Sequence, residues 1–266
     1  MDSTYRSLLT ILAWHIAGSP AHAGTPAGQD NRPCAPAIVA VVGEHAGIKG
    51  LSHPRPGLKP SAENGGTVVA NACKVWPGAS GRMLAAIAYD DGSIATKKLF
   101  VALLDTSKKA VVATYSGSIQ EDAAMTLGPD SLSLDTAPYH LAPGVRAFGL
   151  DTESEFSQGC VDGGFGPVRT LFVQEGKILR PVLENFYIST WRYVRGGPSC
   201  AEADDTLVES TSYTIGVGEP GRHGFSSLRI TATSDSDSAK PARKARSIEL
   251  HYDGKTYPTR ALHRLW

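Results

Sequence analysis

The sequence has no excess of charge of either sign, since 26 Lys and Arg residues balance 26 Asp and Glu residues. A balanced chain creates no overall field that would attract nucleic acid or an anionic lipid surface. After the first 23 residues the chain also lacks any run of roughly 18 consecutive apolar residues. We therefore expect no nucleic-acid partner and no membrane span beyond that point.

A recognisable catalytic motif is also missing. The segment Ser157–Asp162 (SQGCVD) places Cys160 in a context that superficially suggests a nucleophile, but no histidine nearby is marked as its base. The acidic segment Asp90–Ser93 and similar loops lack the ligand spacing of a calcium loop. The sequence favours a non-enzymatic protein with no metal and no cofactor. The alternative is an envelope hydrolase whose catalytic residues are not identifiable from sequence.

Cysteine is scarce, but its number is even. The chain contains only Cys34, Cys73, Cys160 and Cys200. They stand too far apart for a typical zinc site, so we expect two disulfides, for which three connectivities exist. We favour the sequential pairing, Cys34 with Cys73 and Cys160 with Cys200. Each bond would close a loop of about 40 residues and stabilise the fold by roughly 4 kcal/mol.

The first 23 residues have the layout of a secretory signal peptide. Arg6 precedes a short apolar run at Leu8–Gly18, and Ala21-His22-Ala23 supplies small residues at the two positions that a signal peptidase reads. The run is too short to remain as a membrane-spanning helix. We predict cleavage near Ala23 and a soluble periplasmic or secreted protein, which agrees with the expected disulfides.

Residues 24–66 form a second segment, rich in proline and glycine. Proline fixes φ and offers no amide donor, so Thr25–Pro36 and Ser52–Gly66 are unsuited to the interior of a sheet or helix. Between them, Ile38–Val42 is an apolar island that we interpret as one short strand. We expect this segment to be a loosely ordered arm.

Residues 67–266 carry the signals of a single all-β domain. Short apolar stretches rich in Val, Ile, Thr and aromatics alternate with turn residues, as is typical of strands. The expected strands are 83–89, 99–104, 110–115, 145–150, 170–173, 178–183, 186–194, 206–217, 227–233 and 247–252. Only Ser118–Met125 suggests a helix, of two turns at most. The predicted fold is mainly β, with antiparallel hairpins in a sandwich or a partial propeller-like stack.

Three parts of this region share a weak recurrence of strand, acidic loop and hairpin. They begin at Met83, Ala147 and Leu228, and the third contains the turn Asp253-Gly254. An Asp-Gly pair is a strong signal for a two-residue hairpin turn. The recurrence suggests a repeated sheet element, although any all-β chain produces similar coincidences.

Trp191, Tyr193 and Arg195 form the best candidate recognition surface. In a regular strand they share one face, because side chains alternate. An exposed Trp, Tyr and Arg ladder suits stacking on a sugar or anchoring a protein partner. The competing interpretation is that these aromatics cover an edge of the core, with arginine stems above them. We predict a non-enzymatic envelope protein that binds a partner protein or a cell-wall saccharide.

Three further blocks carry a resemblance. They are Cys73–Pro77 (CKVWP), Leu134–Gly149 (LDTAPYHLAPGVRAFG) and Leu171–Leu183 (LFV through LRPVL). Together they resemble an uncharacterised family of exported proteins of Gram-negative bacteria, over most of the chain from Cys73 onward. The resemblance implies a periplasmic protein and carries no known activity.

Overall fold

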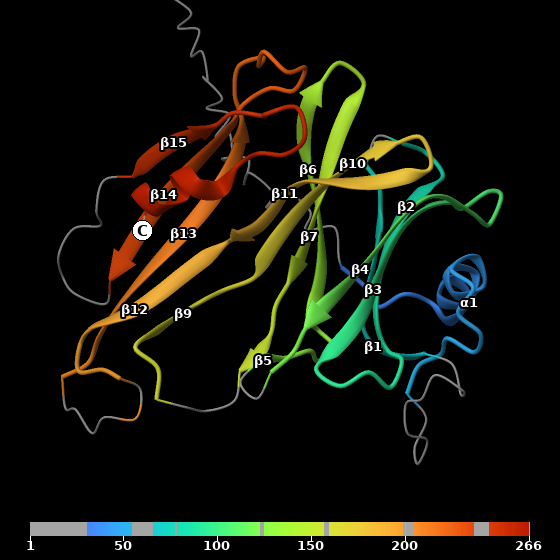
Figure 1. The fold of residues 1–266 in the computed structure, drawn as a ribbon, viewed down its shortest axis with the longest axis horizontal. Helices are drawn as coiled ribbons and strands as arrows, with labels where there is room; N and C mark the ends of the chain where they lie inside the picture. Colours follow the sequence, from blue (N-terminus) through green and yellow to red (C-terminus); the bar gives the residue numbers. More distant parts are fainter. Residues whose placement is uncertain are drawn as a thin grey trace, which may run out of the picture.

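The computed structural model describes residues 31–54, 66–77, 79–122, 125–156, 160–198, 200, 205–236 and 245–265. The predicted leader, residues 1–23, lies outside these ranges. The described chain is mainly β, as predicted, and forms a large curled sheet, a second smaller sheet and a two-stranded ribbon (Figure 1). No helix in these ranges has the length and apolar character that crossing a membrane requires.

The large sheet has eight strands in the order β1-β2-β3-β4-β11-β10-β7-β6. Its bounds are β1 Thr67–Val75, β2 Arg82–Asp90, β3 Thr96–Asp105, β4 Ala110–Gln120, β6 Leu132–Ala142, β7 Val145–Thr152, β10 Val168–Glu175 and β11 Ile178–Tyr187. Strands β1–β4 form one antiparallel meander, and β6, β7, β10 and β11 form another. The two meanders join through a short parallel contact between β4 and β11, at Thr114 and Ile178.

This sheet curls into a half-barrel around an apolar interior. Trp76, Phe148, Phe172 and Tyr115 form a column of aromatic contacts inside it, with successive ring centroids 5.3, 5.5 and 5.0 Å apart. Curling brings the two end strands, β1 and β6, close to each other. Lys74 spans this seam, because its Nζ donates a hydrogen bond of 2.8 Å to the carbonyl oxygen of Leu134.

The second sheet has the order β15-β14-β13-β12-β9. Its strands are β9 Gly163–Phe165, β12 Ser189–Arg195, β13 Leu207–Val217, β14 Leu228–Ser236 and β15 Arg246–Leu250, and the 3-10 helix η1 (Thr259–Arg264) follows them. The two-stranded ribbon pairs β5 (Met125–Thr126) with β8 (Glu155–Phe156).

One bent ribbon connects the two sheets. Strands β10 and β11 pair in the large sheet, and their continuations β9 and β12 pair in the small one. Pairing continues across the bend, where Gly166 N donates to Ser189 O (2.8 Å) and Ile188 N donates to Pro167 O (2.9 Å). Glycine and proline at such a bend allow a strand to leave one sheet and enter another. The segment predicted as one strand, 186–194, is therefore divided between the two sheets.

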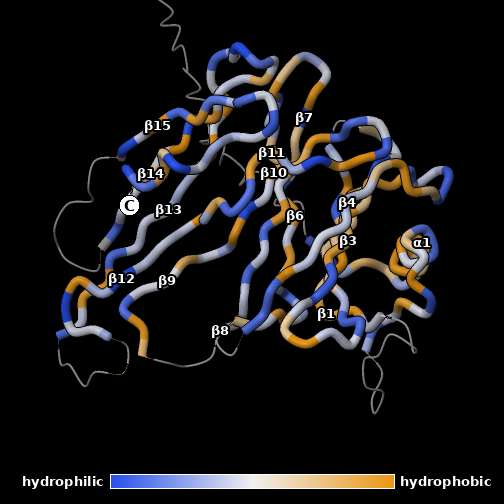
Figure 2. The backbone as a smooth tube through the Cα atoms, viewed as in Figure 1, coloured by the Kyte–Doolittle hydropathy of each residue, from blue (hydrophilic) through white to orange (hydrophobic). Residues whose placement is uncertain are grey.

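Three apolar clusters hold the fold together. One fills the half-barrel, one lies between its β6–β11 half and the small sheet, and one lies beneath α1 (Pro36–His45). Figure 1 shows α1 and the small sheet on opposite sides of the large sheet. In Figure 2 the tube is strongly hydrophobic along β3 and paler along β13. This difference fits a strand buried on both faces and one buried on a single face.

The strand prediction for Ile38–Val42 is wrong, because these residues belong to α1. Pro36 occupies the first turn, where a missing amide hydrogen costs nothing. Val39 and Val42, three residues apart, are each 1% exposed and pack on the outer face of the large sheet. Burying such a side chain contributes about 1.5–3 kcal/mol, which outweighs the slight preference of valine for strands.

Two further expectations are corrected. The predicted helix Ser118–Met125 does not form, because Ser118–Gln120 pair with β3 and Met125 belongs to β5.

Asp253-Gly254 does form a turn, with Gly254 at φ 100°, but no strand follows it among residues 255–265. Instead, the Tyr257 amide donates to the Val182 carbonyl oxygen (2.7 Å). Strands β1, β5, β6, β8 and β9 were not predicted.

Both disulfides have the predicted connectivity, Cys34–Cys73 and Cys160–Cys200. The first joins the chain before α1 to β1, and the second joins the chain before β9 to the loop after β12. Two disulfides are typical of proteins from an oxidising compartment outside the cytoplasm. Cys160 therefore has no thiol to act as a nucleophile.

Candidate functional site

The predicted surface at Trp191, Tyr193 and Arg195 is only partly assembled. Trp191 and Tyr193 are half-buried and contact each other edge to face, with ring centroids 5.6 Å apart. A bulge after Tyr193 then pairs Arg195 with Leu207 and interrupts the alternation on which the three-residue ladder depends. Arg195 forms an exposed ion pair with Asp205 at 3.0 Å. The expectation that all three side chains share one face is therefore not met, and a binding role for the two aromatics stays a prediction.

Two glycines create the space that these rings occupy. A Cβ at Gly164 on β9 would lie 2.7 Å from Trp191 Nε1, and one at Gly197 would lie 2.4 Å from Tyr193 Cβ. The indole of Trp191 therefore lies against the backbone of the neighbouring strand. The two rings are thus packed against the glycine backbone of β9 and of the loop after β12.

A polar groove of about 350 Å³ lies next to this edge, on the small sheet. Trp191 borders it, and the remaining lining comes from four strands and the C-terminal segment. These residues are Thr190, Arg192, Glu209, Thr211, Tyr213, Ser234, Arg246 and Leu265. Tyr213 also belongs to the core between the two sheets, so the groove begins where that core ends.

Two hydroxyl pairs and one ion pair line the groove. Thr211 Oγ1 lies 2.8 Å from Ser234 Oγ, and Thr190 Oγ1 lies 3.1 Å from the hydroxyl oxygen of Tyr213. Each such pair uses one hydroxyl hydrogen in its own bond, which leaves the second hydrogen and further lone pairs for a ligand.

The ion pair consists of Arg192 and the buried carboxylate of Glu209. Nε and Nη2 of Arg192 donate to Glu209 Oε2 at 3.0 and 2.6 Å. Arg246, at the end of the groove, donates from Nη2 to the carbonyl oxygen of Leu265 and thereby ties β15 to the C-terminal segment. The groove thus offers several donors and acceptors in fixed positions, which suits a ligand rich in hydroxyl groups.

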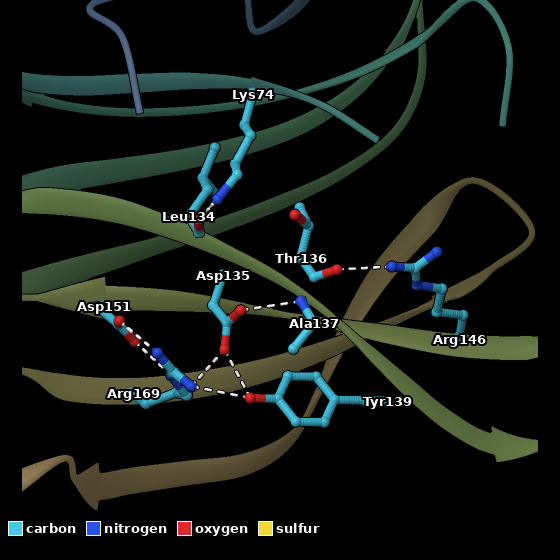
Figure 3. Close-up of polar contacts among 9 residues, drawn as sticks. All are labelled: Lys74, Leu134, Asp135, Thr136, Ala137, Tyr139, Arg146, Asp151 and Arg169. Carbon is cyan, nitrogen blue, oxygen red and sulfur yellow. Dashed lines mark hydrogen bonds and ion pairs between the residues drawn. The ribbon is translucent and has the colours of Figure 1, made fainter. Parts of the chain in front are cut away.

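A second polar cluster centres on Arg169 of β10 (Figure 3). Its Nε and Nη2 each donate to one oxygen of the Asp151 carboxylate, both at 2.6 Å. Its Nη1 donates to Asp135 and, at 2.9 Å, to the hydroxyl of Tyr139. The Tyr139 hydroxyl in turn donates to Asp135 Oδ2 at 2.6 Å. The cluster joins β6, β7 and β10.

Gly149 makes this arrangement possible. It lies on β7 between Asp135 of β6 and Leu171 of β10. A Cβ at Gly149 would lie 3.1 Å from Asp135 Cβ and 3.2 Å from both Cδ and Nε of Arg169. Because glycine has no side chain, the arginine can cross β7 and reach Asp135.

The electrostatics of this cluster indicate a structural role. Burial alone would lower the pKa of Arg169, but the hydrogen bonds and charge of Asp151 raise it above the ordinary value. Burial also raises the pKa of Tyr139, which stays a hydroxyl donor. Burial lowers the pKa of Lys74, whereas the charges of Asp135 and Asp151 oppose that shift. Every charge in the Arg169 cluster is paired with an opposite charge of the same cluster.

A shallow depression of about 630 Å³ is the place to test the hydrolase alternative, since its lining includes Glu175 and Glu184. A glycoside hydrolase requires two carboxyl groups, one of which acts as an acid with a raised pKa. Here Arg180 Nη2 donates to Glu175 Oε1 at 2.7 Å, and this bond lowers the pKa of Glu175. The shift has the wrong direction for Glu175 to act as a general acid.

The predicted acidic loop at Asp90–Ser93 is occupied by internal contacts. Asp90 accepts the Gly92 amide at 2.7 Å and lies 3.0 Å from Lys97 Nζ, and Asp91 accepts the Ser93 amide at 3.0 Å. Within the described ranges, no group of three or more His, Cys, Asp or Glu side chains could hold a metal ion.

Sequence reasoning missed Arg192, Glu209 and Arg169 as members of polar clusters. A usable signal existed for the Arg192–Glu209 pair, since opposite charges on successive strands can lie directly across from each other. No such signal existed for Arg169 and Asp135, which are separated by 34 residues and by the intervening strand β7.

Comparisons with protein-family models, curated proteins and solved structures return no match.

Proposed function

We propose that this chain is an exported, non-enzymatic protein of the bacterial envelope that binds a cell-wall saccharide. The observation that supports this proposal is the groove on the small sheet, where two hydroxyl pairs lie beside the Arg192–Glu209 ion pair. Sugars present many hydroxyl groups that both donate and accept hydrogen bonds, so they match a lining of this kind. The periplasm is the compartment that fits two disulfides and the predicted leader.

The charge of the groove defines the class of saccharide. Its lining carries two arginines and one glutamate, and Glu209 is already bonded to Arg192. A neutral sugar or one with a single acidic group suits this balance, whereas a polyanion does not.

A matched pair of threonines tests the proposal. Thr211 pairs with Ser234 in the groove, and Thr231 pairs with Ser247 elsewhere on the same sheet, each at 2.8 Å between hydroxyl oxygens. The full chain, exported so that both disulfides form, is mixed with purified bacterial cell-wall sacculi and with soluble disaccharide fragments from them. We expect Thr211→Val to weaken saccharide binding about fivefold, because one hydrogen bond from the protein to the saccharide is lost. Thr231→Val should leave the affinity unchanged.

Equal affinities for the two variants, or no binding of either probe, would contradict the proposal.

Trp191→Ala and Tyr193→Ala separately test the prediction that these two aromatics form a recognition surface. An intact fold with lost binding would assign these aromatics to recognition. Loss of the folded state, followed by near-ultraviolet circular dichroism, would assign them to packing on β9 and the following loop.

A further inference from the structure

A second concave site lies at one end of the half-barrel, on the part of the molecule away from the groove. It has a volume of about 550 Å³ and forms where the β1–β2 loop meets the β6–β7 hairpin. Its polar lining consists of Arg82, Arg146, His140 and Gln174, and no carboxylate is among its lining residues. A concave basic surface without acids attracts anions, since field lines are focused inside a low-dielectric depression.

Arg146 carries a charge that no acid offsets. Its Nη1 donates to the carbonyl oxygen of Pro77 (2.7 Å) and its Nη2 to that of Thr136 (2.6 Å), the second of which is drawn in Figure 3. Both acceptors are neutral, and no carboxylate of the described residues forms an ion pair with it. These bonds hold the guanidinium rigidly at the site and dock the β1–β2 loop against β7.

Arg82, the second arginine, has an unused donor. Its Nη1 is buried and has no hydrogen-bond acceptor in the described structure. Asp105 forms an ion pair with Arg82 through Oδ2, which lies 3.9 Å from Nη1 and is too distant for a hydrogen bond. The Arg82 side chain also lines the depression, so its guanidinium can offer charge-assisted hydrogen bonds to an anion bound there.

The remaining wall is apolar. Trp76 is half-buried with its ring edge to face against Phe148, and the buried Leu103 lies in the same lining. An inorganic ion would leave this surface in contact with water. A ligand whose anionic group is attached to a ring or another compact apolar body would cover it.

We propose that this depression binds a small organic anion, with a phosphate or carboxylate group held by Arg82 and Arg146 and an apolar body against Trp76. This ligand class differs from that of the saccharide groove. The two sites share no lining residue, so either proposal can fail without the other.

Isothermal titration of the full oxidised chain tests the proposal with phenyl phosphate, benzoate, inorganic phosphate and benzyl alcohol. We expect phenyl phosphate or benzoate to bind saturably and at least tenfold more tightly than inorganic phosphate or benzyl alcohol, with an affinity that falls as salt rises. The stronger of the two identifies the anionic group. Failure of both organic anions to bind saturably, or equal affinity for inorganic phosphate, would overturn the proposal.

Variants distinguish this site from general attraction to arginine. Arg82→Gln should weaken binding of the organic anion about tenfold or more, because it removes one charge-assisted donor, whereas Arg82→Lys should retain part of the affinity. Arg229, an exposed arginine on the small sheet, provides the control, and Arg229→Gln should have no effect. Thr211→Val should likewise leave anion binding unchanged. If Arg82→Gln binds as tightly as the unaltered chain, the site is not the one proposed.

Discussion

Replacing Arg169 with methionine should strongly destabilise the fold. Methionine retains a flexible apolar stem of similar length over Gly149 but removes every donor. Asp151, whose side chain is 12% exposed, then loses the bonds to both of its carboxylate oxygens. Asp135 retains the Tyr139 hydroxyl and the Ala137 amide as donors.

The expected magnitude follows from the difference between the two carboxylates, because Asp151 loses both of these bonds and Asp135 keeps two donors. Removing one partner of a buried ion pair costs about 3–5 kcal/mol, because an unpaired charge stays in the interior. For a chain of this size, that loss corresponds to a fall of roughly 10 °C in Tm. Arg229→Met is the matched control, since Arg229 and Glu249 form an ion pair with side chains 56% and 36% exposed. Exposed pairs contribute only about 0–1 kcal/mol.

Urea unfolding at neutral pH under oxidising conditions, followed by far-ultraviolet circular dichroism, measures both variants. Adding Asp151→Asn to Arg169→Met should recover part of the loss, because the second change removes the unpaired charge. A loss below about 1 kcal/mol for Arg169→Met, or no recovery in the double variant, would refute this reasoning.

Three further outcomes are expected. Gly149→Ala should cost about 1–3 kcal/mol in unfolding free energy, because its Cβ crowds the Arg169 side chain, whereas Gly216→Ala, whose nearest neighbour is 3.8 Å away, should cost far less. Burial lowers the pKa of Lys74 from 10.5 in the folded state, so the unfolded chain binds more protons between the two pKa values and stability should rise with pH in that window. Lys74→Met should abolish this rise, and a pH series of unfolding curves for both chains measures it. Replacing both Cys34 and Cys73, 39 residues apart, by serine should cost roughly 4 kcal/mol by thermal unfolding, and an unchanged Tm would contradict that expectation.

Strands were the part of the fold that sequence reasoning predicted well. Short runs rich in β-branched residues between turn residues correspond to β2, β3, β4, β7, β10, β11, β13, β14 and β15. The first two recurring units also occupy equivalent places, since each contributes three neighbouring strands to one of the two meanders. The third does not, because no strand follows the turn at Gly254 among residues 255–265.

The errors occurred where tertiary contacts outweigh local preference. Pro36–His45 (PAIVAVVGEH) contains the β-branched residues of a strand, but burial of Val39 and Val42 against the large sheet selects a helix. Ser118–Gln120 have a helical context, but pairing with β3 satisfies their backbone groups instead. In both places the deciding partner lies far away in the sequence.

Composition and spacing by themselves determined the mainly β class and, through four widely spaced cysteines, the two disulfides. These properties depend on local residue preference and on cysteine number and spacing. The polar clusters depend instead on register, since Arg169 meets Asp135 only because β6, β7 and β10 align at Gly149. A shift of one residue in either pairing would turn those side chains to opposite faces. Only the tertiary structure sets that register, so it alone decided which charged and hydroxyl groups meet in the groove, in the Arg169 cluster and at the end of the half-barrel.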